Sequence, residues 1–93
     1  MISVSKSFDG TLATVSGDRA ELMLFFCIWQ TALWPDWIAA TCENVGAIQQ
    51  HTAAVETIRD KGELLLHDAS RLFENACALA INRCRLLGVE VSA

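Results

Sequence analysis

The 93-residue chain has little of what several classes of protein depend on. It contains one proline, five glycines and only seven lysines and arginines, against eleven aspartates and glutamates. The net charge of −4 argues against a nucleic-acid-binding protein, because affinity for nucleic acid comes largely from Lys and Arg on phosphates. The same balance argues against a polybasic membrane-surface module. A phosphate-binding loop is also excluded, since Gly10 and Gly17 stand in predicted turns without G-x-G-x-x-G or Walker spacing.

Residues 1–8 lack the basic and long apolar regions of a signal peptide. The four cysteines, an even number, would favour disulfides in a secreted chain; they are Cys27, Cys42, Cys77 and Cys84. Cys27 and Cys77 stand in apolar sequence that is predicted to be helical, where a reduced thiol behaves as a small hydrophobic group. We therefore expect a cytoplasmic protein whose four reduced thiols pack in the core.

Residues for metal or nucleophilic chemistry are poorly spaced. The cysteines are too far apart in sequence for the close ligand pairs of structural zinc sites. The stretch His67-Asp68-Ala69-Ser70 holds three residue types of a catalytic triad, but neighbouring helical positions point in different directions. We expect no enzymatic activity, no metal and no cofactor.

The N-terminal residues are predicted to form a β-hairpin from strands 2–8 and 11–16. Asp9-Gly10 favours a two-residue type I′ turn, because both central positions of that turn need positive φ. One face of this hairpin is partly apolar, whereas the other is rich in Ser and Thr, which suits a sheet with one solvated side. The predicted cross-strand pairs are Phe8 with Thr11, Lys6 with Ala13 and Val4 with Val15.

The next segment, Leu22–Trp34, is apolar on every side of a helix, which is typical of a buried central element. Asp18 and Glu21 before it resemble a capping box. The uncharged stretch is shorter than the ~20 residues that a membrane span requires, so a buried helix is the better interpretation.

Two further helices are predicted, over Asp36–Ile58 and Glu63–Leu87, the second ending at a Gly88 cap. Val89–Val91 alternates and is predicted to form a short strand that joins the hairpin in a small antiparallel sheet. The sequence thus predicts a single α+β domain over residues 1–93, in the order β-β-α-α-α-β. The alternative is a mostly helical bundle with a peripheral hairpin.

The apolar content points to an interaction function. Hydrophobic residues make up 53% of the chain, before glycine is counted, against about 45–50% with glycine included in typical domains. A small domain cannot bury all of this surface, and exposed apolar patches mark interaction sites. We expect a non-catalytic module that forms a homodimer or binds another protein. Its predicted interface is an apolar helix and tryptophan surface made by Phe25, Trp29, Leu33, Trp34 and Trp37.

Two other functions remain open at this point. Residues 22–42 could insert into a membrane as a hairpin broken at Pro35, although Asp36 at the membrane centre would be costly. Alternatively, the chain could be a small ligand-binding protein or enzyme with an apolar pocket near His51.

Overall fold

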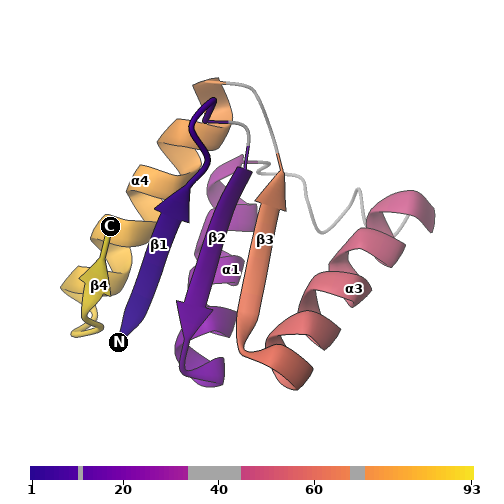
Figure 1. Cartoon of the computed structure of the whole chain (residues 1–93), viewed down its shortest axis with the longest axis horizontal. Helices are drawn as coiled ribbons and strands as arrows, with labels where there is room; N and C mark the ends of the chain where they lie inside the picture. Colours follow the sequence, from indigo (N-terminus) through magenta and orange to yellow (C-terminus); the bar gives the residue numbers. More distant parts are fainter. Residues whose placement is uncertain (11, 34–44, 68–70) are drawn as a thin grey trace.

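A four-stranded mixed sheet with helices packed against one face forms the fold, shown as a computed structural model in Figure 1. The structure describes residues 1–10, 12–33, 45–67 and 71–93. The α+β class is confirmed, and the sheet excludes a mostly helical bundle. The described elements are β1 (Ile2–Lys6), β2 (Leu12–Gly17), α1 (Arg19–Leu33), α3 (Val45–Lys61), β3 (Glu63–His67), α4 (Arg71–Leu86) and β4 (Val91–Ser92).

The hairpin forms in the predicted register, with Val4 opposite Val15 and Lys6 opposite Ala13. The strands end at a turn that differs from the expected type I′ turn. The Gly10 N–H donates to the Ser7 carbonyl over 3.0 Å, so Phe8 and Asp9 are the central residues of this turn instead of the predicted Asp9 and Gly10. Gly10 has a φ of 74°, but no described non-glycine residue has positive φ. The type I′ prediction is therefore wrong, because that turn needs positive φ at two successive positions.

Helix α1 starts where the sequence indicates. Asp18 Oδ2 accepts hydrogen bonds from the N–H groups of Ala20 (3.1 Å) and Glu21 (3.2 Å), which are otherwise unpaired in the first helical turn. The capping box itself is incomplete. The Glu21 carboxylate accepts a hydrogen bond of 2.9 Å from the amino group of Met1 and so ties the end of β1 to the helix.

The segment that follows α3 is a strand rather than the start of a helix. The predicted helix Glu63–Leu87 is wrong over residues 63–67, which form β3; residues 68–70 lie outside the described ranges, and α4 begins at Arg71. The reason is burial with a period of two: Leu64 and Leu66 are buried while Leu65 is 47% exposed. Gly62, with a φ of 65°, ends α3 and turns the chain into the sheet.

Helix α3 ends three residues later than the predicted Asp36–Ile58. It covers Val45–Lys61, and the earlier part of the prediction lies outside the described residues. Gly46 is the second residue of α3, where a glycine interrupts little of the helix.

The predicted cap of the last helix is confirmed. The N–H of Gly88 donates to the Arg85 carbonyl (3.1 Å) and that of Val89 to the Cys84 carbonyl (2.9 Å), the two bonds of a Schellman motif. The chain then enters β4, which pairs with β1 in parallel. The antiparallel C-terminal strand that we predicted is therefore wrong. Helix α4 carries the chain back behind the sheet to the end where β1 begins, so β4 runs in the same direction as β1 (Figure 1).

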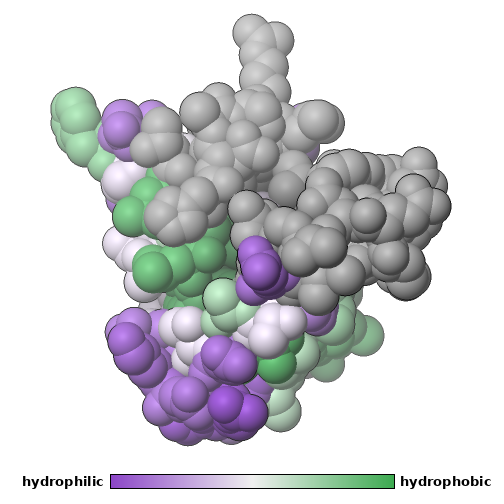
Figure 2. All heavy atoms as spheres, turned by 90° about the vertical axis from the view of Figure 1, so that its right-hand side faces the viewer, coloured by the Kyte–Doolittle hydropathy of each residue, from purple (hydrophilic) through white to green (hydrophobic). Residues whose placement is uncertain are grey.

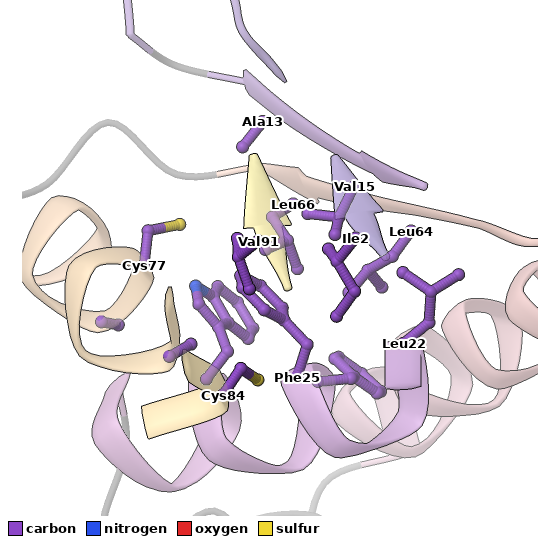
Figure 3. Packing of buried hydrophobic residues seen from close by; sticks show 14 of the residues in the cluster. Ile2, Ala13, Val15, Leu22, Phe25, Leu64, Leu66, Cys77, Cys84 and Val91 are labelled. Carbon is purple, nitrogen blue, oxygen red and sulfur yellow. The ribbon is translucent and has the colours of Figure 1, made fainter. Parts of the chain in front are cut away.

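The core lies between the sheet and the helices α1 and α4 (Figure 3). Fully buried side chains from β1, β2, β3 and both helices meet there, among them Ile2, Val15, Leu22, Phe25, Leu64, Cys77 and Cys84. The opposite face of the sheet carries the hydroxyl-rich side of the hairpin, where Ser3 and Ser5 are exposed. This confirms the prediction of a sheet with one solvated side.

Candidate functional site

Of the five predicted interface residues, two lie in the core, and the side chains of the other three are not described. Phe25 is completely buried and Trp29 is 7% exposed, and both belong to the core of the chain itself. Leu33 is the last residue of α1, and its side chain is not described. Trp34 and Trp37 lie outside the described residues. Phe25 and Trp29 are therefore not part of the surface, and the predicted tryptophan surface is reduced to positions that the structure does not describe.

Helix α1 nevertheless presents a face to solvent, contrary to the expectation that it is buried on every side. Cys27 and Thr31, one helical turn apart, are exposed, whereas Phe26 and Gln30 are buried. Sequence alone does not distinguish these faces, because α1 is apolar on nearly all of them. The sheet and α4 decide which face becomes core.

A polar contact between α1 and α3 is the most specific side-chain arrangement near the predicted His51 pocket. Gln30, only 6% exposed, places its side-chain nitrogen 2.8 Å from His51 Nδ1. An amide nitrogen can only donate, so Nδ1 accepts and the ring proton of the neutral imidazole is on Nε2. The His51 ring also stacks on Phe26 with 5.5 Å between centroids. These contacts use His51 to join two helices.

The ring stack continues from Phe26 to Trp29, whose centroids are 6.2 Å apart and whose planes differ by 18°. Trp29 in turn lies close to the thiol of Cys77 in α4. A chain of contacts thus runs from α3 through α1 to α4. Within this chain of contacts the Gln30 amide and His51 Nδ1 satisfy each other, as buried polar groups in stable cores usually do.

The thiols occupy different environments, so the expectation that all four pack in the core is only partly right. Cys77 and Cys84 are buried free thiols, and burial raises the pKa of each above its usual value. Because a thiol reacts as its thiolate, both are weak nucleophiles at neutral pH. Cys27 is exposed on α1, contrary to the prediction, and Cys42 lies outside the described residues.

The remaining sequence candidates are described only in part. His67 ends strand β3 rather than lying on a helix, and 68–70 lie outside the described residues. In the described ranges no three His, Cys, Asp or Glu side chains are grouped as metal ligands. The guanidinium of Arg85 donates to the Val91 carbonyl over 2.8 Å and so holds β4 to α4.

Exposed hydrophobic side chains are a surface feature that the sequence did not locate. They occur on two separate parts of the molecule. Phe8 at the hairpin turn and Leu65 on β3 belong to the sheet, and Figure 2, which faces β3 and α3, shows hydrophobic atoms at this surface. Leu79 on α4, with Leu86 and Leu87 at its C-terminal end, makes up the second group, with Leu86 86% exposed.

The membrane alternative finds no support in α1, which comprises 15 residues. No helix in the described ranges is long and apolar enough to cross a membrane. The second half of the predicted membrane hairpin, from residue 34, lies outside those ranges.

Comparison of the chain with models of protein families, with curated proteins and with solved structures gives no match. The assignment of a function therefore depends on the arrangement of the side chains described above.

Proposed function

We propose that this chain is a non-catalytic, cytoplasmic protein-interaction domain that forms a homodimer. The observation that supports the proposal is the set of large hydrophobic side chains that remain on the surface after the core is complete. Phe8 is fully exposed, and Leu65, Leu79, Leu86 and Leu87 range from 37% to 86% exposure. Scattered apolar residues are normal on a protein surface. Their number on so small a domain favours a surface that a partner covers.

A cytoplasmic setting fits the state of the described cysteines. Cys77 and Cys84 are free thiols in the core. Reducing compartments keep thiols in this form.

The proposal is tested by sedimentation equilibrium of the purified chain over micromolar concentrations. We expect a mass of twice 10.2 kDa that dissociates on dilution. A mass of 10.2 kDa over the whole range contradicts self-association.

The tryptophan surface is tested in the same measurement with Trp34→Ala and Trp37→Ala. The sequence prediction is that both variants weaken assembly more than they weaken folding, because aromatic anchors contribute most at the centre of an interface. Ser5→Ala and Thr14→Ala, on the hydroxyl-rich face, are the control variants and should affect neither property.

A further inference from the structure

The outer edge of β3 is the longest unpaired strand edge in the described structure. The sheet has the order β3-β2-β1-β4, so β3 and β4 are at its two ends. β4 contains two residues, whereas β3 contains five. Helix α3 meets β3 at the turn near Gly62 and leans away from the strand toward its other end (Figure 1). β3 therefore offers a row of backbone donors and acceptors.

The hydrogen-bond pattern of the sheet determines which backbone groups face outward. The Gly17 N–H donates to the Gly62 carbonyl over 3.3 Å, so Gly17 in β2 directs its backbone toward β3. Alternation along an antiparallel pair gives the same direction to Val15 and Ala13, whose partners are Leu64 and Leu66. The N–H and C=O groups of the intervening β3 residues point to the outer edge. These residues are Glu63, Leu65 and His67.

The sequence of β3 carries little of the protection that natural edge strands usually have, with Glu63 as its one acidic residue. The strand reads Glu-Leu-Leu-Leu-His and contains no lysine, proline or bulge. Such features prevent edge strands from pairing with another chain. Leu65 at the centre of the strand is 47% exposed on the open face of the sheet. An added strand would cover the backbone of Leu65 and part of its side chain.

We propose that β3 pairs antiparallel with β3 of a second copy of this chain, about a twofold axis at Leu65. The inference rests on the proposed self-association and identifies its contact surface. With Leu65 opposite Leu65 of the second copy, the three outward-facing residues of each strand meet in hydrogen-bonded pairs. The two sheets join into one continuous sheet of eight strands. The closed twofold symmetry leaves no β3 edge for a third copy.

Repulsion between like charges selects the antiparallel direction over the parallel one. In this register position 63 of one copy is opposite position 67 of the other, so the sequence sets glutamate across from histidine at both ends. A parallel pairing in register sets Glu63 beside Glu63 of the second copy. Like charges directly opposite each other destabilise a strand pair. A second copy of β3 in the antiparallel direction avoids this repulsion and is therefore the partner that fits the strand.

The test compares two substitutions of exposed leucines by lysine, followed by sedimentation equilibrium. Leu65→Lys places two like charges across the twofold axis. We expect the dissociation constant of the dimer to rise about tenfold or more. Leu86→Lys makes the same change at a more exposed site on α4 and should leave the dimer intact. Circular dichroism verifies that both variants fold. A dimer that persists in Leu65→Lys but is lost in Leu86→Lys or Trp34→Ala overturns the β3 pairing and leaves the proposed function standing. A monomeric wild-type chain contradicts both.

A second measurement decides the question if Leu65→Lys fails to fold. In a chain with Cys27 and Cys42 replaced by serine, Leu65→Cys brings two thiols together across the axis. The Cα atoms of such a pair are about 5.5 Å apart, within the range of a disulfide. Glu63→Cys is the matched control, because its two copies are offset by four residues, or about 13 Å. Mild oxidation should cross-link the first variant and not the second. Equal cross-linking of the two variants overturns the register, and no cross-linking of either overturns the pairing.

Discussion

The side-chain nitrogen of Gln30 lies 2.8 Å from Nδ1 of His51 and donates a hydrogen bond that joins α1 to α3. Gln30 is only 6% exposed, so its amide has little access to water as an alternative partner. The His51 ring is stacked on Phe26 at the same junction. The position of α3 against α1 therefore depends on a polar contact that is set in apolar surroundings.

This pair should show strong coupling in a double-mutant cycle. Gln30→Leu leaves His51 Nδ1 without its donor, and His51→Phe leaves the Gln30 amide without its acceptor. Each single variant should lower the free energy of unfolding by about 1–3 kcal/mol, the cost of an unsatisfied buried polar group. The double variant should lose less free energy of unfolding than the two single variants added together, because neither polar group remains. Urea unfolding measures the three values, and additive losses would show that the contact contributes nothing.

A local contact of this kind could not be predicted from the sequence, although the hairpin could. Val4 and Val15 pair as expected because alternation and a turn signal are local properties of the chain. The Asp18 and Gly88 helix ends are likewise encoded within a few residues. Gln30 and His51 are 21 residues apart, and their meeting depends on how α3 packs against α1, which no local pattern determines.

Strand β3 was missed for a related reason. Its three leucines are strong helix formers, and Leu65 falls in register with the apolar stripe of the helix that follows. A short apolar run of this kind suits a strand or a buried helix equally well. The structure resolves the ambiguity through β2, because Val15 and Ala13 direct their backbone groups toward Leu64 and Leu66. Tertiary pairing outweighs helix propensity here.

Two glycines with positive φ should respond differently to alanine. At Gly17, with a φ of 150°, a Cβ would lie 2.3 Å from the Met1 carbonyl oxygen, so the backbone of β1 must shift. At Gly88, with a φ of 88°, no heavy atom lies within 4 Å of the added Cβ. We expect Gly88→Ala to cost about 1 kcal/mol for backbone strain alone, and Gly17→Ala to cost about 3 kcal/mol or more. Thermal and urea unfolding give both values, and equal losses would show that the contact at Gly17 is relieved without cost.

The helix cap at Asp18 should contribute measurably to stability. Asp18→Ala removes the acceptor for the N–H groups of Ala20 and Glu21 and should lower the free energy of unfolding by about 0.5–2 kcal/mol. Asp18→Ser retains an acceptor and should recover most of the loss. Urea unfolding measures the stability of both variants. An alanine variant as stable as the serine variant would contradict the capping role of Asp18.

Thiol labelling should separate the described cysteines into two classes. Cys27 is exposed and should react quickly with a maleimide, whereas Cys77 and Cys84 should react only when the protein opens. Peptide mass mapping after short labelling identifies each site. Fast labelling of Cys77 in the absence of denaturant would contradict its position in the core.

The same two buried thiols predict a loss of stability in alkaline solution. Burial raises the pKa of Cys77 and Cys84 above the ordinary 9.0, so the unfolded chain releases these protons first as pH rises. Their contribution is complete below pH 9.0 and is lost as pH rises through the higher folded values. The free energy of unfolding should therefore fall above this pH. A variant with Cys77→Ala and Cys84→Ala should lose this part of the pH dependence, and an unchanged alkaline profile would exclude the thiols as its source.

Two phenylalanines provide the sharpest test of where the core ends. Phe25, predicted from the sequence as an interface residue, is completely buried, whereas Phe8 is fully exposed at the hairpin turn. Phe25→Ala should lower the free energy of unfolding by about 3–5 kcal/mol, because it removes a large side chain and leaves a cavity between α1 and the sheet (Figure 3). Phe8→Ala makes the same change in solvent and should stay within about 0.5 kcal/mol of the parent chain. Urea unfolding at protein concentrations below the dissociation constant of the dimer measures folding separately from assembly. If Phe25→Ala were as stable as Phe8→Ala there and instead lost only assembly, α1 would present Phe25 to a partner and the packing of the core would be wrong.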